Sequence, residues 1–313
     1  MSAPKLFTGS AHPKLAADIA AQLGVQLADG TVERFPDGEA HVRLNERVRG
    51  EDVFLVQPTG PPPDAHLVEL ALMADACRRA GAGRVTAVIP YFAYSRADHR
   101  SADGEAVGTR VAADVLTGAG VERIVVVDPH TTALEAASAV PVESITAVPT
   151  LAAAVTEELS GEVVIVAPDL GAVKLAERFC ELLDAPGAFV RKTRLSGSTV
   201  ETAGIVGEVR DRLPVIVDDM ITTAGTIEAA AAALRSAGCE ADLVVAATHG
   251  LLVADAVDRL SALPLQRLVL SDSLPVSGDL PLPLRIESLA EPLGRAITRL
   301  HRHEPLAELA SRG

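Results

Sequence analysis

The sequence predicts an α/β protein with two tandem domains and mainly parallel sheets. Short, continuous apolar runs such as Val163–Ala167 alternate with longer stretches of helical periodicity, which is the pattern of parallel strands covered on both faces. The two halves are also similar: Leu116-x-x-Ala-Gly120 precedes one apolar run, and Leu234-x-x-Ala-Gly238 precedes another about 118 residues later. Because 313 residues suffice for two ordinary cores, we expect domains at residues 1–145 and 146–313.

The first half begins with a strand and a helix. Leu6–Ser10 is an apolar run that enters a turn, and Pro13–Leu23 has apolar residues at helical spacing and is followed by a glycine cap. Thr31–Phe35 and Ala40–Leu44 flank a Pro-Asp-Gly turn, which predicts a β-hairpin. The other predicted elements are the strands Val53–Gln57, Arg84–Ile89 and Arg123–Val127, a helix with Leu67, Leu70, Ala71, Ala74 and Cys77 on one face, and a helix over Glu105–Leu116.

The second half repeats this order. Its predicted elements are the strand Val163–Ala167, the helix Ala172–Leu183, the strands Gly187–Val190 and Val215–Val217, the helix Ile227–Ala237, and the strands Leu243–His249 and Leu265–Leu270. A polar loop is expected to start at Lys192. The C-terminal segment Leu284–Gly313 adds a helix with Leu289, Leu293, Ile297 and Leu300. The sequence does not decide which half this last helix packs against.

Composition excludes several classes of protein. The formal charge of −14 argues against a nucleic-acid partner, because binding to phosphate backbones draws on clustered Lys and Arg. The cysteines Cys77, Cys180 and Cys239 are widely spaced, so neither a zinc site nor a disulfide framework follows. The first residues lack a secretory pattern, and no uncharged apolar run reaches membrane-spanning length. We therefore expect a cytoplasmic enzyme without a membrane or nucleic-acid partner.

Two acidic residues follow the strand Val215–Val217. Asp218 and Asp219 are expected at the carboxyl end of this strand, where open α/β sheets bind ligands. Carboxylates accept hydrogen bonds, and the vicinal hydroxyls of a ribose donate them. The small or hydroxylated residues that come next expose main-chain N–H groups and a helix start to a phosphate; they are Thr222, Thr223, Ala224, Gly225 and Thr226. The combination predicts a ribose 5-phosphate site.

The alternative is a solvent-facing strand end with a threonine helix cap. That interpretation is the better one for an isolated Asp-Asp pair. The full spacing Asp-Asp-x-x-x-Thr-Ala-Gly-Thr favours the ligand site instead.

Further polar residues stand in two loops and at two strand ends. The long loop Pro90–Gly104 carries Arg96, Asp98 and His99, which could clamp a polyphosphate or could simply be a charged surface loop. His130 and Asp128 follow the strand Arg123–Val127 and could approach Mg²⁺, although a histidine at a strand end is more often structural. Asp169 follows the strand Val163–Ala167. A phosphate-binding protein this acidic is expected to recruit Mg²⁺ to offset the charge of its ligand.

Lys192 and Arg194 alternate on an extended segment. Side chains two residues apart on a strand share a face, so both could point toward one anionic centre. The alternative is ordinary solvated charge.

These motifs resemble known families. Val217–Ile227 resembles the phosphoribosyl-diphosphate binding motif of type I phosphoribosyltransferases and of ribose-phosphate diphosphokinases. Nearly the whole chain is similar to the diphosphokinases, which implies two tandem phosphoribosyltransferase-like (Rossmann-like) domains. The activity that this implies is transfer of diphosphate from MgATP to the C1 hydroxyl of ribose 5-phosphate, giving phosphoribosyl diphosphate and AMP.

The resemblance also implies roles for single residues. Phe35, Asp37 and Glu39 lie in a hairpin similar to the one that contacts the adenine of ATP, usually from a neighbouring subunit. Arg96-Ala-Asp98 and Asp128-Pro-His130 look like the segments that handle ATP and Mg²⁺, and Ala167–Gly171 looks like the strand end whose Asp169 touches ribose and metal. Lys192-Thr-Arg194-Leu-Ser196 is similar to the catalytic loop, and its sequence is most similar to that of the archaeal-type branch. A homo-oligomer, a dimer or a hexamer, is implied as well.

Two departures from the family pattern leave alternatives open. Ala97 replaces the usual Gln, and Thr222 replaces a frequent Asp. A nucleobase phosphoribosyltransferase would use the same central loop without the ATP elements. A non-catalytic paralogue that assembles with a true synthetase would tolerate both changes.

Overall fold

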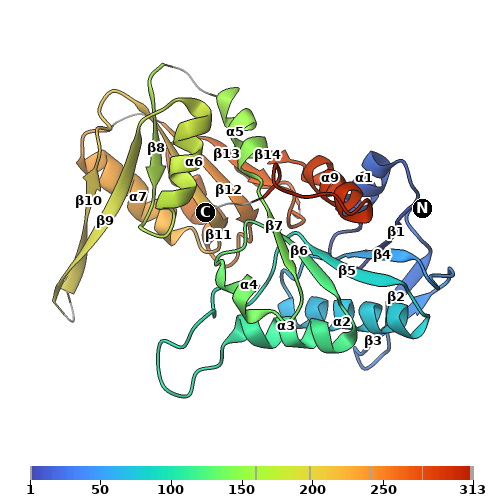
Figure 1. Cartoon of the computed structure of the whole chain (residues 1–313). Coiled ribbons are helices and arrows are strands. Elements are labelled where there is room, and N and C mark those ends of the chain that lie inside the picture. Colours follow the sequence, from blue (N-terminus) through green and yellow to red (C-terminus); the bar gives the residue numbers. More distant parts are fainter. Residues whose placement is uncertain (1, 159–160, 197–198, 240–241, 277, 311–313) are drawn as a thin grey trace. The chain divides into compact units, whose positions relative to one another are not determined.

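The computed structural model describes residues 2–158, 161–196, 199–239, 242–276 and 278–310, with only the backbone at 192–196 and 199–203 (Figure 1). The chain divides into two compact units. Among the described residues, the first comprises 2–146, 273–275 and 288–310, and the second comprises those within 147–272 and 276–287. The sequence predicted a second domain over 146–313, whereas the segment 288–310 clusters with the first unit.

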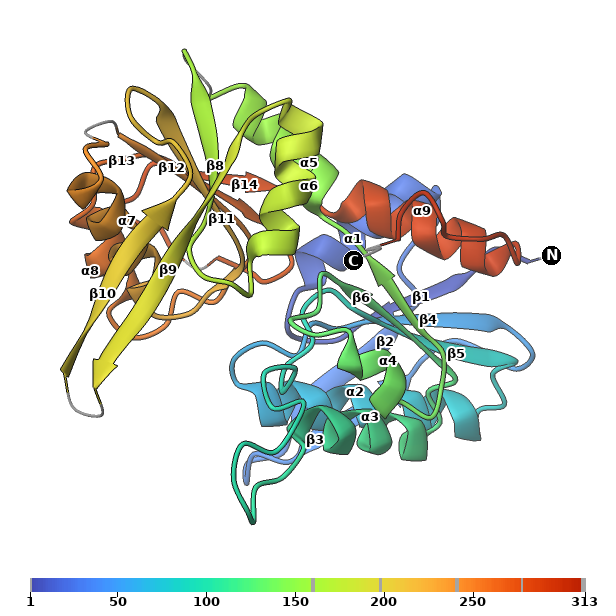
Figure 2. The ribbon, with the colours of Figure 1, turned by 60° about the vertical axis from the view of Figure 1, so that its left-hand side comes forward.

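The described part of the first unit is built on a parallel sheet with the strand order β1-β4-β5-β6-β7. The strands are β1 (Lys5–Thr8), β4 (Asp52–Val56), β5 (Arg84–Ile89), β6 (Arg123–Val127) and β7 (Val142–Ile145). A separate antiparallel hairpin joins β2 (Gly30–Arg34) to β3 (Ala40–Leu44). In Figures 1 and 2, α2 (Pro63–Arg79) and α3 (Gly108–Ala119) cover one face of the sheet, and α1 (Pro13–Leu23) and α9 (Ala290–His301) cover the other. The short α4 (Ala133–Ala137) follows β6.

The second unit has the described strand order β10-β9-β8-β11-β12-β13-β14. Its strands are β8 (Val163–Ala167), β9 (Gly187–Ser196), β10 (Thr199–Val206), β11 (Leu213–Ile221), β12 (Leu243–Gly250), β13 (Leu265–Ser271) and β14 (Leu284–Glu287). All neighbours in this order are parallel except β9 and β10. The helices α5 (Val148–Thr156) and α6 (Val173–Leu183) lie on one face, and α7 (Gly225–Ser236) and α8 (Ala256–Ser261) lie on the other (Figure 2). The predicted α/β fold with mainly parallel sheets is confirmed.

The cores are made of small and branched aliphatic side chains. Val53, Leu55, Val85 and Ile124 are fully buried in the first unit, and the equivalent strands of the second unit are as apolar. Burial on both faces explains why these strands are continuous apolar runs rather than alternating ones.

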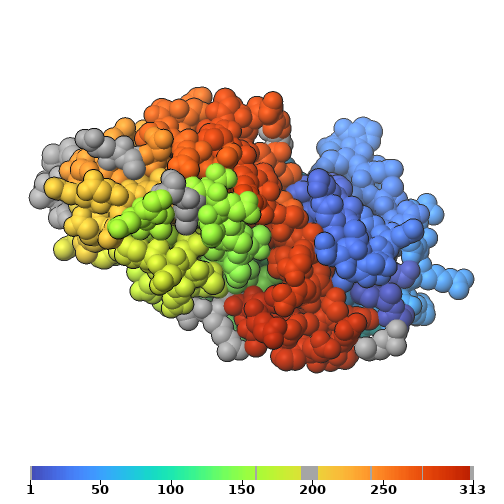
Figure 3. Space-filling view, turned by 90° about the horizontal axis from the view of Figure 1, so that it is seen from above, coloured from blue at the N-terminus to red at the C-terminus, as the bar shows by residue number. Residues whose placement is uncertain are grey.

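The last helix, whose position the sequence did not decide, packs on α1. Figure 3 shows the C-terminal segment, coloured red, beside the blue N-terminal residues. Gly294 permits the close approach, because a Cβ added there would lie 3.1 Å from Cβ of Gln22.

Two predicted boundaries were wrong for physical reasons. The helix expected from Glu105 begins at Gly108, because the Glu105 carboxylate accepts hydrogen bonds from the main-chain N–H groups of Ser101 (2.7 Å) and Ala102 (3.1 Å) and so belongs to the preceding loop. The loop expected from Lys192 is instead the continuation of β9, which pairs with β10 as far as Ser196. The elements α4, β7, α5, β10, α8 and β14 were not predicted.

Candidate substrate-binding site

The two aspartates lie near the carboxyl end of β11, where one neighbouring strand has already stopped. β11 pairs with β8 only from Leu213 to Ile216, while its pairing with β12 continues to Ile221. Asp218 and Asp219 therefore lie within the strand rather than after it, but beyond the last residue paired to β8. Ligands of open α/β sheets bind at such carboxyl ends of strands.

Three carboxylates interact at this edge. Burial raises the pKa of Asp218 to about 8, and the negative charges of Asp219 and then Asp169 act in the same direction. Asp169 follows β8, and its Oδ1 accepts a hydrogen bond of 2.9 Å from the main-chain N–H of Gly171. The structure thus brings together the three aspartates that the sequence singled out in the second unit. The mutual repulsion would be relieved by a cation or by hydroxyl donors of a ligand.

The small-residue loop connects β11 to α7. Ala224 is the N-cap of α7 and has the left-handed conformation, with φ of 60°. The first turn of any helix leaves main-chain N–H groups without a partner inside the helix, and here that turn starts at Gly225 and Thr226. The N–H of Val253 donates to the carbonyl of Thr222 (2.9 Å), so the segment after β12 fixes the start of the loop. The loop therefore leads directly into a helix start that offers main-chain N–H donors.

A cation that the sequence did not reveal lies beside this loop. Nη1 of Arg259, on α8, lies 3.4 Å from the position that a Cβ on Gly225 would occupy. Arg259 forms ion pairs with Glu228 (2.9 Å) and Asp255 (2.8 Å). In the sequence, Asp255 and Arg259 have the ordinary i, i+4 spacing of an ion pair on a helix, and no sequence pattern predicts that they lie next to residue 225.

Lys192 and Arg194 lie on β9, with their side chains outside the described part of the chain. In the antiparallel pair, Lys192 is opposite Ala203 and Arg194 is opposite Glu201. The two residues share one face of the strand, as the sequence predicted from their spacing. β9 is also the parallel neighbour of β8, the strand that ends before Asp169.

In the first unit, the loop after β5 is anchored rather than loose. Tyr91 and Phe92 are buried, and both the main-chain N–H and the hydroxyl of Thr59 donate to the carbonyl of Tyr91. The hydroxyl of Tyr94 donates to Asp64, and this bond raises the pKa of Tyr94. Arg96, which follows these anchored residues in the chain, is exposed.

The next residues of this loop reach the segment after β6. The carboxylate of Asp98 accepts a hydrogen bond from the Thr131 side chain and lies 2.6 Å from Nδ1 of His99. Both contacts lower the pKa of Asp98, and the hydrogen bond from Thr131 has the larger effect. Thr131 directly follows Asp128-Pro-His130. The structure therefore brings together two groups of candidate residues that are separated in the sequence.

Asp128 and His130 differ in their surroundings. Asp128 is buried and has a φ of 33°, and its N–H donates to the carbonyl of Ile145 (3.0 Å). His130 is exposed. Among the residues that the structure describes, no three His, Cys, Asp or Glu side chains are grouped as a complete metal site.

The hairpin turn presents an aromatic ring. Phe35 is 49% exposed, and its ring centroid lies 5.2 Å from that of His41. Oδ1 of Asp37 accepts from the N–H of Glu39 (3.1 Å), which shapes the turn.

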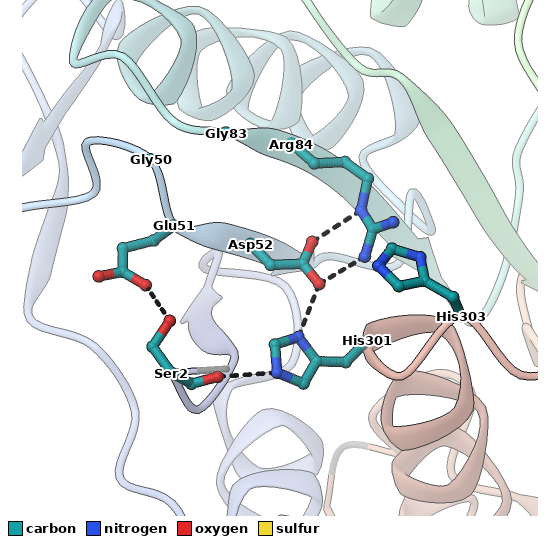
Figure 4. Close-up of a pocket in the computed structure, with 8 residues that line it drawn as sticks. All are labelled: Ser2, Gly50, Glu51, Asp52, Gly83, Arg84, His301 and His303. Atoms are coloured by element: carbon teal, nitrogen blue, oxygen red, sulfur yellow. Dashed lines mark hydrogen bonds and ion pairs between the residues drawn. The ribbon is translucent and has the colours of Figure 1, made fainter.

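A pocket of about 380 Å³ lies at the opposite edge of the first sheet, where β4 and β5 begin (Figure 4). Asp52 there binds Arg84 through two hydrogen bonds (2.8 and 2.5 Å) and faces Nδ1 of His301 at 2.8 Å. No motif in the sequence marks these residues.

Comparison with known proteins identifies the family. Residues 4–120 match the model described as the N-terminal domain of ribose phosphate pyrophosphokinase, and residues 142–256 match the phosphoribosyl transferase domain. The ribose-phosphate pyrophosphokinase of Gloeobacter violaceus is 40% identical over 97% of this chain and 92% of its own length. The chain belongs to the ribose-phosphate pyrophosphokinase family.

Further relatives support membership of the pyrophosphokinase family. The ribose-phosphate pyrophosphokinase of Caldanaerobacter subterraneus is 38% identical over 97% of both chains. The crystal structure of phosphoribosylpyrophosphate synthetase from Mycobacterium smegmatis is similar with a TM-score of 0.90, at 35% identity over 96% of this chain and 100% of that one. The family resemblance read from the sequence is confirmed, and the chain is an enzyme of the pyrophosphokinase type. Across the described residues no helix is both long and apolar enough to cross a membrane.

Proposed function

We propose that this enzyme transfers the β,γ-diphosphoryl group of MgATP to the C1 hydroxyl of ribose 5-phosphate, giving phosphoribosyl diphosphate and AMP. The observation that carries the proposal is the pairing of Asp218 and Asp219 with an anion-receiving loop at one sheet edge, in a chain of the pyrophosphokinase family. A nucleobase phosphoribosyltransferase is disfavoured by the match of residues 4–120 to the N-terminal pyrophosphokinase domain.

The second unit would bind the sugar. Asp218 and Asp219 would accept hydrogen bonds from the 2- and 3-hydroxyls, and Asp169 would contact the same ribose. The main-chain donors of residues Thr222–Thr226 would hold the 5-phosphate. Binding both ends of the sugar orients its C1 hydroxyl, which removes much of the entropic cost of the reaction.

The first unit would bind ATP. Phe35, Asp37 and Glu39 would contact the adenine, and Arg96, Asp98, His99 and His130 would contact the rest of the nucleotide. The hydrogen bond between Asp98 and Thr131 supports a common role for these two segments, because it fixes one against the other.

The residues fit a divalent cation. Asp169 adjoins a carboxylate cluster in which like charges already raise the pKa of Asp218, and Mg²⁺ prefers carboxylate and water oxygens. In the second unit Asp169 would be a ligand of the ion, and in the first unit the family resemblance assigns the same role to Asp128 and His130. Mg²⁺ would supply positive charge to the diphosphoryl oxygens.

Lys192 and Arg194 would neutralise the charge that develops on the transferred group and on the departing AMP. Their common face on β9 supports this shared role.

Incubation with ATP and ribose 5-phosphate tests the proposal directly. AMP and phosphoribosyl diphosphate should form in equal amounts. A phosphoribosyltransferase would release no AMP but would consume phosphoribosyl diphosphate and a base. A non-catalytic paralogue would release no AMP and would show no heat of MgATP binding in calorimetry.

We further propose a homo-oligomer, a dimer or a hexamer, in which the hairpin completes the ATP site of a neighbour. The 49% exposure of Phe35 at the hairpin turn supports this arrangement. Light scattering after size-exclusion chromatography would test it, and a monomer would contradict it. The residues Lys192–Ser196 support membership of the archaeal-type branch of the family. The free cysteines Cys77, Cys180 and Cys239 support a cytoplasmic location, which cell fractionation would test.

A further inference from the structure

A carboxylate that has no assigned role lies buried in the first unit. The side chain of Glu69, on α2, is 1% exposed. A charge so far from water is retained only when hydrogen bonds and an opposite charge compensate for the lost hydration. The partners of Glu69 therefore indicate what the residue does.

Three hydrogen bonds fix this carboxylate. Its Oε1 accepts from the main-chain N–H of Ser10 (2.6 Å) and from Nε2 of Gln57 (2.6 Å), and its Oε2 accepts from the hydroxyl of Ser10 (2.7 Å). Gln57 follows β4, is fully buried, and accepts from the N–H of Ala11 (3.0 Å). Gly9 is needed beside it, because a Cβ there would lie 2.3 Å from Oε1 of Gln57. Glu69 is thus held rigidly by the segments that leave β1 and β4.

The fourth partner is a cation on the hairpin. Nη2 of Arg34 lies 3.8 Å from Oε2 of Glu69, and Nη1 of the same guanidinium donates to the carbonyl of Gly38 (2.9 Å). Arg34 is the last residue of β2, and Gly38 lies in the turn that presents Phe35. One guanidinium therefore joins the buried carboxylate to the hairpin turn.

The hairpin register shows that Arg34 lies on the side of the hairpin that faces the core of the unit. Arg34 is opposite Ala40 and lies on the same side of the hairpin as Val32 and Val42, which pack against the core. Arg43, opposite Thr31, lies on the other side. The hairpin is thus attached to the unit on one side, by apolar side chains along its length and by Arg34 next to its turn.

We propose that Glu69 is a positioning residue that acts through Arg34 and sets the orientation of the turn Phe35–Glu39 for the adenine of ATP. The inference rests on the proposed function, which assigns this turn to ATP. Glu69 itself touches no substrate.

Glu69→Gln tests this role with little change in shape. The amide oxygen of Gln can still accept from Ser10 N–H and Gln57, and its NH₂ group can donate to the Ser10 hydroxyl, which also accepts. What is lost is the negative charge facing Arg34. We expect KM for ATP to rise roughly three- to fivefold, the upper end of the scale for one partly exposed ion pair, while kcat and KM for ribose 5-phosphate stay close to the wild-type values.

Arg34→Met keeps the proposal testable if Glu69→Gln folds poorly, because Arg34 is 44% exposed. It should raise KM for ATP at least as much as Glu69→Gln, since it also removes the donor to Gly38. The double variant should be no worse than Arg34→Met alone, because a residue that acts through Arg34 has nothing left to position. Arg43→Met, on the opposite side of the same hairpin, is the matched control and should leave KM for ATP unchanged.

The outcomes separate the two claims. An active wild type whose KM for ATP is unaltered in both Glu69→Gln and Arg34→Met would overturn the role of Glu69 alone. Additive effects in the double variant, or equal changes in both KM values, would also overturn it, because they indicate general structural damage. A wild type that releases no AMP would overturn the proposed function itself.

Discussion

The side chain of Thr131 donates a hydrogen bond to the carboxylate of Asp98, and this bond is the largest cause of the lowered pKa of Asp98. It joins the loop after β5 to the segment after β6. These are the two loops assigned to ATP in the first unit.

Thr131→Val should therefore weaken ATP binding. The variant removes one hydrogen bond to a charged acceptor, so KM for ATP should rise about three- to tenfold, with KM for ribose 5-phosphate unchanged. Steady-state kinetics with each substrate varied would measure both. Thr132→Val is the control, because Thr132 caps α4 without a side-chain hydrogen bond. Equal effects of the two variants would remove Thr131 from the ATP site.

Asp219→Asn should act on the other substrate. The carboxylate is assigned to the sugar hydroxyls, and a hydrogen bond to a charged group contributes about 1.5–3 kcal/mol. KM for ribose 5-phosphate should rise about ten- to hundredfold while KM for ATP stays constant. A variant with a normal KM for the sugar would show that the hydroxyls bind elsewhere.

The raised pKa of Asp218 predicts how stability depends on pH. The folded free enzyme holds a proton on Asp218 up to pH about 8, whereas the unfolded chain releases it near pH 4, so this group makes the fold less stable as pH rises between these values. Asp218→Asn should abolish that contribution. The Tm of the variant should exceed that of the wild type by an amount that grows from pH 5 to pH 8. A constant difference across this range would contradict the raised pKa.

Lys192→Ala should lower kcat by roughly a hundred- to a thousandfold, the scale of losing one group that stabilises transition-state charge. KM for ribose 5-phosphate should change little, because the lysine acts on the transferred group. Arg191→Ala is the matched control, since residue 191 lies on the opposite face of β9. Single-turnover rates of AMP release would compare the two. Near-normal turnover of Lys192→Ala would refute its catalytic role.

Two helix glycines predict opposite responses to alanine. At Gly118 an added Cβ meets nothing within 4 Å, so Gly118→Ala should stabilise the protein by about 0.5–1 kcal/mol through helix propensity. At Gly294 the Cβ would lie 3.1 Å from Cβ of Gln22, so the same gain should be offset or reversed. Denaturant unfolding would rank the variants, and equal gains would show that α1 and α9 are not closely packed.

The features that the sequence predicted are those encoded locally. The apolar run before Asp218 and the small residues up to Thr226 are contiguous, so a strand, two acids and a helix start could be inferred without tertiary contacts. Other features depend on contacts between residues that are distant in the sequence, and no local sequence pattern predicts such contacts. They are the contacts of Asp98 with Thr131, of Glu69 with Arg34, and of Arg259 with the position beside Gly225.

The predictions of two element boundaries were wrong for a related reason. Whether the chain after Lys192 is loop or strand depends on pairing with β10, and whether Glu105 starts a helix depends on the N–H groups its carboxylate accepts. Both choices are decided by competition for hydrogen bonds rather than by side-chain periodicity.

The return of α9 to α1 has a consequence for biosynthesis. The first compact unit to be translated lacks one of its covering helices until residues 288–312 emerge, while the second unit is complete as far as residue 287. Domains that fold during translation usually do so from the N-terminus. In this chain the order of completion is reversed: a chain that ended at residue 287 would contain the described part of the second unit, but its first unit would lack the helix that covers the apolar side of α1.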